Sequence, residues 1–265
     1  MKTVTFIVSK GGVGKTLVTA NVGYALAKKN QKVVLLEGDP NQPLQKIFDT
    51  PISAKDPKLD DIIKKDKPIS EAIYPTKTEN LLLLPSGVSL QNYFEIDPIS
   101  FAQKISDLKT DYIFIDVPFP LGKAALLSLG ICQYFIPILT EDEFVLCVES
   151  TIDTIRLSKY LLKSTPLGFV LNRIKTPTTF SKEFTADLEN LLGIPCITRI
   201  NEDPKVSKSY GQVGSEKAFL ACEKLSESEF AKGIDQIATR LMGKLPESEK
   251  DAIRLLQQIT RLSLI

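Results

Sequence analysis

The sequence predicts an α/β fold of the doubly wound class, in which helices lie on both faces of a mostly parallel sheet. Short apolar runs rich in β-branched residues alternate with stretches of helical periodicity along the chain. Polar and acidic residues follow several of these runs, and doubly wound sheets bind ligands at the carboxyl ends of their strands. A chain of 265 residues with 43% hydrophobic and 25% charged residues can bury a large core as one globular domain.

The predicted strands are short apolar segments, and they cover residues 4–8, 32–36, 80–84, 112–116, 134–139, 168–171 and 194–200. The predicted helices cover residues 17–29, 99–109, a long stretch within 143–163, 180–192 and 229–241. Residues 50–78 hold many prolines and charges, which predicts loops with short helices. Pro137 lacks the N–H that a ladder needs, so we expect its segment to be a poor central strand.

The segment 9–16 reads SKGGVGKT and stands between the first predicted strand and the first predicted helix. This is the context of a phosphate-binding loop, whose glycines let backbone N–H groups approach phosphate oxygens. The following helix adds unpaired N–H groups and the positive end of its dipole. Lys15 is expected to reach the β- and γ-phosphates, and Thr16 to ligate Mg²⁺ through its hydroxyl. The expected nucleotide contacts of this segment are Gly11, Gly12, Val13, Gly14, Lys15, Thr16 and Leu17.

The string KGGVGKT carries an early lysine, Lys10, and has Ser9 where an ordinary P-loop has glycine. It resembles the deviant Walker A motif of the MinD/ParA family of ATPases. The resemblance covers about residues 1–243 and implies a P-loop NTPase domain that binds ATP and Mg²⁺. It also implies an ATP-dependent homodimer in which Lys10 touches the nucleotide of the other subunit.

Residues 37–40 read EGDP at the end of the second predicted strand. They are similar to the family's Asp-x-Asp-Pro motif, with Glu37 in place of the first aspartate. The resemblance implies that Asp39 positions the attacking water. It also implies that Asp39 belongs to the magnesium shell, bound to the ion through water. The catalytic residues that it implies are therefore Lys10, Lys15 and Asp39.

Asp116 ends an apolar run, where a carboxylate is costly to bury without a function. It resembles the Walker B aspartate of the family, which implies that it holds a magnesium-bound water beside Thr16. The family continues with Pro-Pro-Gly-x-Gly, whereas residues 118–122 read PFPLG. Pro120 therefore stands in place of a glycine and has no N–H. If the backbone N–H of that glycine normally contacts the γ-phosphate in the family, we expect hydrolysis to be impaired in this chain.

Two asparagines resemble residues that surround adenine in the family. Asn172 follows the predicted strand 168–171, and its amide can both donate to and accept from a purine edge. Residues 200–204 read INEDP and are similar to the family's Ile-Pro-x-Asp loop beside the base, with Asn201 in place of proline. These positions complete the predicted ATP site.

The composition excludes several other kinds of site. The chain has no histidine, which removes histidine-based catalysis and the commonest metal ligand. Its four cysteines form no C-x-x-C pair, which argues against zinc, an iron–sulfur cluster or a disulfide framework. No apolar run approaches about 18 residues, so we expect no membrane span. A strand follows the N-terminus directly, so we expect no signal peptide. We therefore expect a cytoplasmic location.

These features favour an ATP-dependent dimerisation switch with slow hydrolysis, similar to the MinD-type positioning ATPases, that acts with an unidentified regulatory protein. One alternative is a ParA-like ATPase that binds DNA nonspecifically, although a net charge of +1 does not indicate it. Another is an ATP-binding adaptor with little hydrolysis, which Pro120 favours.

The predicted tail, residues 244–265, contains a linker and an amphipathic helix. Its apolar face consists of Ala252, Leu255, Leu256, Ile259 and Leu262. Residues 247–265 either pack on protein or make a reversible peripheral contact with a membrane.

Overall fold

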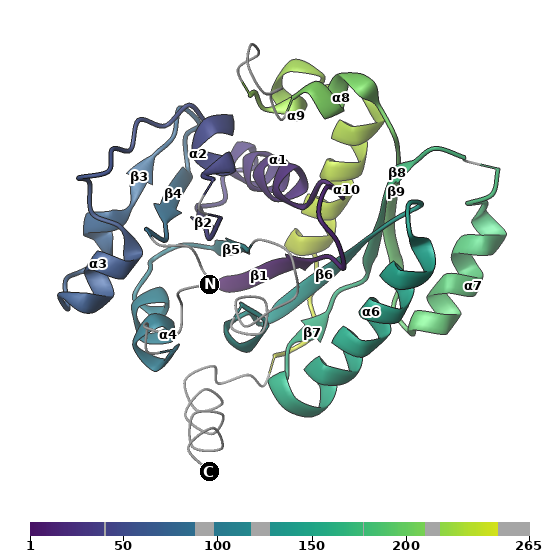
Figure 1. Cartoon of the computed structure of the whole chain (residues 1–265), viewed down its shortest axis with the longest axis horizontal. Helices are drawn as coiled ribbons and strands as arrows, with labels where there is room; N and C mark the ends of the chain where they lie inside the picture. The colour runs from purple at the N-terminus through teal and green to yellow at the C-terminus, as the bar shows by residue number, and fades with distance from the viewer. Residues whose placement is uncertain (40, 88–97, 118–127, 177, 210–217, 249–265) are drawn as a thin grey trace.

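The computed structural model describes residues 1–39, 41–87, 98–117, 128–176, 178–209 and 218–248, and it confirms the doubly wound fold (Figure 1). The described strands form one sheet in the order β3-β4-β2-β5-β1-β6-β8-β9, with β7 also beside β6. In chain order they are β1 (Lys2–Ile7), β2 (Val33–Glu37), β3 (Tyr74–Pro75), β4 (Leu81–Pro85), β5 (Tyr112–Asp116), β6 (Tyr134–Thr140), β7 (Thr165–Pro166), β8 (Phe169–Ile174) and β9 (Cys196–Asn201). The pairing of β3 with β4 is antiparallel, and the other pairings are parallel.

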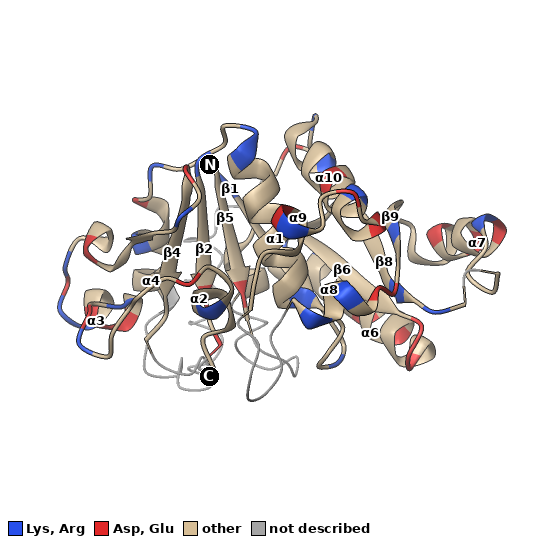
Figure 2. Cartoon of the chain, turned by 90° about the horizontal axis from the view of Figure 1, so that it is seen from above, with Lys and Arg blue, Asp and Glu red and all other residues tan. Residues whose placement is uncertain are grey.

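Helices cover both faces of the sheet (Figure 2). One face carries α1 (Lys15–Lys28), α2 (Pro43–Ile47), α8 (Pro204–Lys208), α9 (Ala221–Lys224) and α10 (Glu229–Met242). The other face carries α3 (Leu59–Lys64), η1 (Ile69–Ala72), α4 (Pro98–Ser106), α6 (Phe144–Leu157), η3 (Ser158–Leu162) and α7 (Lys182–Leu192). Successive residues of the central strands therefore enter opposite cores, which is why these strands read as continuous apolar runs.

The carboxyl ends of β2 and β5 lie together at one edge of the sheet. Glu37 is paired with Asp116 in the parallel register, and the Gly38 N–H donates to the Asp116 carbonyl at 2.8 Å. β1 lies between β5 and β6, so the loop that follows β1 emerges at the same edge. The parallel topology thus gathers the polar motifs of three strands around one loop.

The prediction that Pro137 makes β6 a poor central strand is wrong. β6 lies between β1 and β8, and Pro137 is paired with Ile7 of β1. On its other side β6 pairs with β7 up to Phe135 and with β8 only from Ile138. Pro137 therefore lies opposite the point where β7 ends and the pairing with β8 begins. The hydrogen-bond ladder on that side of β6 is interrupted at this point, so the missing N–H of Pro137 is tolerated.

Residues 50–78 contain the predicted short helices, α3 and η1, together with the unpredicted edge strand β3. The predicted helix within 143–163 is α6, which continues as a π-helical turn, η3. β8 and β9 both extend further along the chain than predicted, so Asn172 lies within β8 rather than after it. The differences in the strands follow from strand pairing, which local patterns do not contain.

Residues immediately after α10 contact the domain. Leu245 packs against the core, and the Tyr134 hydroxyl donates to the Pro246 carbonyl at 2.8 Å. Pro40, Pro120 and residues 249–265 lie outside the described residues, so the predictions about Pro120 and the amphipathic tail stay predictions. In the part of the chain that the structure describes, every helix is too short or too polar to cross a bilayer.

Candidate nucleotide-binding site

The glycine-rich loop joins β1 to α1, as the sequence predicts. Gly12 and Gly14 have φ values of 78° and 89°, in the left-handed region that suits glycine. A Cβ on Gly14 would lie 2.8 Å from Asn172 Nδ2. Gly14 is therefore required both by its backbone conformation and by the close approach of β8.

Lys15 and Thr16 converge on the carboxylate of Asp116, which is 1% exposed. Lys15 Nζ forms an ion pair with Asp116 Oδ1, and the Thr16 hydroxyl donates to Oδ2 at 2.7 Å. The Thr19 hydroxyl lies 3.4 Å from Oδ1. The structure thus brings together Lys15, Thr16 and Asp116, three of the residues that the sequence predicted for phosphate and magnesium binding.

This donor set fits Mg²⁺. A hydroxyl and a carboxylate lie side by side, and Mg²⁺ commonly takes one or two protein oxygens and completes its octahedron with water and phosphate. Among the described residues no three histidine, cysteine or carboxylate side chains are grouped closely enough to hold a metal ion by themselves. Thr16 and Asp116 would therefore hold the ion together with a nucleotide.

The loop after β2 is fixed at both ends by carboxylates. Glu37 is buried, and its Oε1 accepts from the backbone N–H groups of Leu44 and Gln45 at the start of α2. Burial raises the pKa of Glu37 to about 8, and the nearby charges of Asp116 and Asp39 add to the shift. Asp39 accepts from the Asn41 N–H at 2.8 Å and lines the cavity. Glu37 thus anchors the loop that carries Asp39.

Lys10 contacts an acidic residue of its own chain. Its Nζ lies 3.4 Å from Glu143 Oε1, immediately before α6, and Ser9 Oγ lies 3.1 Å from Cys147 Sγ within that helix. The start of α6 therefore rests against the glycine-rich loop. The contact of Lys10 with a second subunit stays a prediction.

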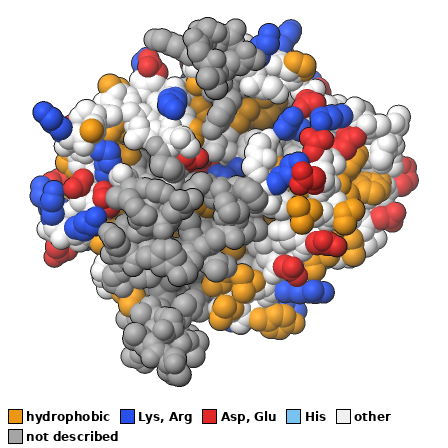
Figure 3. Space-filling view, in the orientation of Figure 1, with side chains coloured by type: hydrophobic (Ala, Val, Ile, Leu, Met, Phe, Trp, Pro, Cys, Tyr) orange, Lys and Arg blue, Asp and Glu red, His pale blue; other side chains and the backbone are white. Residues whose placement is uncertain are grey.

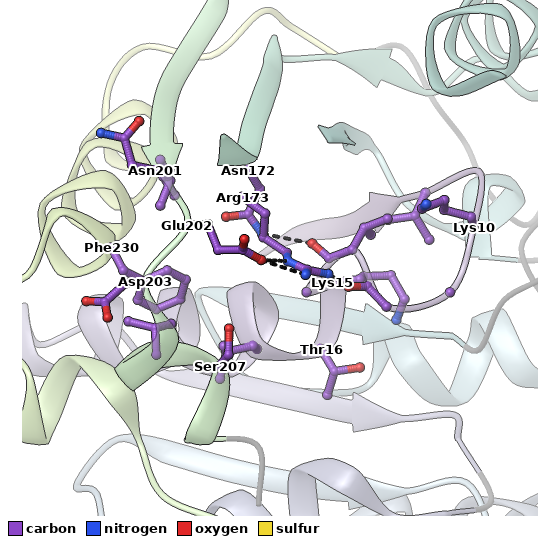
Figure 4. A pocket seen from close by; sticks show the side chains of 18 of the residues that line it. Lys10, Lys15, Thr16, Asn172, Arg173, Asn201, Glu202, Asp203, Ser207 and Phe230 are labelled. Atoms are coloured by element: carbon purple, nitrogen blue, oxygen red, sulfur yellow. Dashed lines mark hydrogen bonds and ion pairs between the residues drawn. The ribbon is translucent and has the colours of Figure 1, made fainter. Parts of the chain in front are cut away.

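A cavity of about 620 Å³ opens beside the loop (Figure 4). One wall is the glycine-rich loop, and the opposite wall is the segment from the end of β9 into α8, backed by Phe230 of α10. Asn172 and Asn201 both line it. Asn172 is buried and its Nδ2 donates to the Val13 carbonyl at 2.8 Å, whereas Asn201 is exposed at the end of β9.

Arg173 and Glu202 also line the cavity, and sequence reasoning gave neither of them a role. Arg173 donates to the Gly12 carbonyl and to Glu202, so it connects the two walls (Figure 4). The only local signal was a pair of opposite charges directly after the two asparagines. Their contact depends on the pairing of β8 with β9, which is a tertiary feature.

Comparison with known proteins finds nucleotide-binding relatives. A family model described as an AAA domain matches residues 1–165. An uncharacterized ATP-binding protein of Methanocaldococcus jannaschii is 34% identical over 268 residues, which cover 100% of this chain and 97% of that protein. The septum site-determining protein MinD of Synechocystis is 29% identical over 252 residues, 89% of this chain and 87% of that protein.

A solved structure is also similar. The septum site-determining protein MinD of Pyrococcus horikoshii, complexed with Mg-ADP, matches this chain with a TM-score of 0.73 at 25% identity. The match covers 91% of this chain and 96% of the other. The likeness therefore extends over most of this chain, and the similar protein was solved with Mg-ADP bound.

Proposed function

Because this chain belongs to the MinD/ParA family of P-loop ATPases, we propose that it is an ATP-dependent dimerisation switch with slow hydrolysis. ATP and Mg²⁺ bind at the glycine-rich loop, two subunits close face to face, and hydrolysis returns them to monomers. The observation that carries the proposal is the convergence of Lys15 and Thr16, which line the cavity, on the buried carboxylate of Asp116.

Catalysis would rest on charge and positioning, since the chain has no histidine. Lys15 would stabilise the charge on the transferring phosphoryl group, and Thr16 and Asp116 would hold Mg²⁺. When bound, Mg²⁺ neutralises charge that develops on the phosphate oxygens. Asp39 would orient the attacking water, with Glu37 holding its loop in place.

The face around Lys10 supports the dimer. Val145 and Leu146 are 69% and 49% exposed at the start of α6, beside the Lys10–Glu143 pair. Large apolar side chains exposed next to a ligand site are typical of an interaction surface. Lys10 would leave Glu143 and reach the nucleotide of the second subunit.

The surface on which the switch acts is proposed to be a membrane, reached through residues 247–265. Two tails in a dimer bind a membrane more tightly than one, because the second binds at high effective concentration. Binding to DNA in place of lipid would support the ParA-like alternative, and ATP binding without turnover would support the adaptor alternative.

Substitution of Lys15 tests the proposal. Titration with ATP and Mg²⁺ should show binding to the parent protein and none to Lys15→Ala, whereas the exposed control Lys77→Ala should bind normally. Asp39→Ala should bind ATP but hydrolyse it at least tenfold more slowly. The proposed function is wrong if the parent protein does not bind ATP, or if Lys15→Ala binds it equally well.

A further inference from the structure

Arg173 has an unusual backbone conformation for its position. It lies within β8 with a φ of 55°, in the left-handed region that residues other than glycine rarely adopt. The register between β8 and β9 shifts between Leu171 and Ile174, so the strand bulges at this residue. Such outliers persist only where the surrounding structure holds them, and they are concentrated at functional sites.

The side chain of Arg173 connects the two walls of the cavity. Nη1 donates to the Gly12 carbonyl of the glycine-rich loop at 2.7 Å. Nε and Nη2 donate to Glu202 Oε1 at 3.0 and 2.6 Å. Glu202 is held a second time, because its N–H donates to the Ile174 carbonyl at 2.9 Å. Arg173 can contact the Gly12 carbonyl and Glu202 at the same time because its guanidinium carries several N–H donors in a planar fork. The single ammonium group of a lysine cannot reproduce this geometry.

The glycine-rich loop has a second support that does not involve Arg173. Asn172 Nδ2 donates to the Val13 carbonyl at 2.8 Å. The opposite wall, residues 201–207, begins with exposed Asn201 and continues into α8, a helix of only five residues. Without the Arg173 side chain the wall would keep the backbone bond from the Glu202 N–H to the Ile174 carbonyl, but its link through Glu202 to the glycine-rich loop would be lost.

We propose that Arg173 is a positioning residue that fixes the wall at residues 201–207 against the glycine-rich loop, so that a nucleoside phosphate meets a preorganised base site. A preorganised wall loses less freedom on binding, so the nucleoside part of the ligand contributes more affinity. The inference rests on the proposed nucleotide site. It assigns Arg173 to recognition of the nucleoside rather than of the phosphates.

The test compares ligands with and without a nucleoside. ATP, ADP and inorganic tripolyphosphate, each with Mg²⁺, are titrated into the parent protein and Arg173→Ala by calorimetry. Affinity for ATP and ADP should fall about tenfold, which is about 1.4 kcal/mol. Affinity for tripolyphosphate should change less than twofold. Arg156→Ala, which removes an exposed ion pair with Asp153 on α6, is the matched control and should bind all three ligands normally.

Arg173→Gly separates the guanidinium from the backbone, because glycine adopts this φ without strain. It should bind ATP as weakly as Arg173→Ala does. The double variant Arg173→Ala with Glu202→Ala should bind ATP with the same affinity as Arg173→Ala alone, because the two residues act through one contact. The inference is wrong if Arg173→Gly binds ATP like the parent protein, or if tripolyphosphate loses as much affinity as ATP. Failure of the parent protein to bind ATP would instead contradict the proposed function.

Discussion

Within the described part of the chain, three non-glycine residues with left-handed backbone lie in or next to segments that surround the candidate site. Gln42, Glu143 and Arg173 have φ values of 55°, 54° and 55°. Gln42 and Glu143 follow the carboxyl ends of β2 and β6, and Arg173 lies near that end of β8. Each conformation is unfavourable by itself, so the surrounding structure must hold it.

At the residue scale, the Lys10–Glu143 pair makes the role of Lys10 testable. Lys10→Ala should retain ATP binding, because Lys15 and the loop N–H groups remain, but it should not form the ATP dimer. Glu143→Ala should dimerise at least as well as the parent protein, since it only frees Lys10. Light scattering with ATP measures both, with Lys77→Ala as control. A stable Lys10→Ala dimer would exclude the contact across the interface.

The buried Glu37 predicts a pH dependence of stability. The folded protein keeps the proton of Glu37 to about pH 8, whereas the unfolded chain releases it near pH 4.5. The unfolded state therefore binds fewer protons between these values, and the free energy of unfolding contributed by Glu37 falls as pH rises through this window. Glu37→Gln keeps an acceptor for the N–H groups of Leu44 and Gln45 but cannot ionise.

We expect Glu37→Gln to be more stable than the parent protein at pH 8.5, by about 2–5 kcal/mol, and to match it near pH 5. Urea unfolding of the ligand-free protein in chelator, at several pH values, measures the difference. The exposed residue Glu227 provides a control, because Glu227→Gln should leave the slope unchanged. Parallel stability curves for Glu37→Gln and the parent protein would show that Glu37 is ionised in the fold.

At the element scale, α10 supports the wall of the cavity through β9. A Cβ on Gly233 would lie 2.6 Å from Ile200 Cγ1, and Ile200 lines the cavity. The absence of a side chain at Gly233 therefore allows the close packing of α10 on β9. The apolar periodicity of residues 229–241 predicts the helix, but only the packing shows why glycine stands in its middle.

Gly233→Ala should destabilise the protein by about 1 kcal/mol. Overpacking costs about 1–3 kcal/mol, and the better helix propensity of alanine offsets up to about 1 kcal/mol of it. Thermal unfolding measures the loss, and ATP titration should show weaker binding because Ile200 is displaced. Gln236→Ala, at an exposed position of the same helix, should change neither quantity. A Gly233→Ala protein of unchanged stability and affinity would mean that Ile200 moves freely.

At the scale of the whole molecule, exposed large apolar side chains lie at both ends of the α6–η3 helix, among charged residues (Figure 3). Val145 and Leu146 lie at the end beside the glycine-rich loop, whereas Tyr160 and Leu161 lie at the opposite end. Only the first pair adjoins the proposed dimer face. The two ends therefore provide a matched comparison.

Leu146→Glu should weaken the ATP dimer at least tenfold, because it places a charge in an apolar contact. Leu161 is 45% exposed, close to the 49% of Leu146, so Leu161→Glu should dimerise normally. Sedimentation velocity with ATP measures both constants, and ATP titration checks that each variant still binds nucleotide. Equal dimerisation of the two variants would remove this face from the interface.

The tail can be tested by truncation after Ser248, which keeps the contacts of Leu245 and Pro246 with the domain. The full chain should sediment with anionic liposomes more in ATP than in ADP, whereas residues 1–248 should stay in the supernatant while still binding ATP. A chain that ends at Gly243 should be less stable than residues 1–248. If both proteins sediment with the liposomes to the same extent, lipid binds to a part of the chain other than residues 249–265. If neither protein sediments, the result favours the DNA alternative.

The sequence by itself determined the doubly wound class, most of the helices and strands, and the glycine-rich loop. Apolar periodicity and the spacing of glycine, lysine and threonine are local properties, so they can be recognised without a structure. Asp116 could be predicted for the same reason, since a carboxylate at the tip of an apolar strand is unusual.

Only the tertiary structure decided the position of Pro137, the anchoring of the Asp39 loop by Glu37, and the bridge that Arg173 forms to Gly12 and Glu202. Each depends on which strands are neighbours and in which register they pair. Strand order and register arise from contacts between residues far apart in the chain, and the pattern within one segment does not specify them. For this reason the residues proposed to bind phosphate could be found in the sequence, whereas those that shape the opposite wall could not.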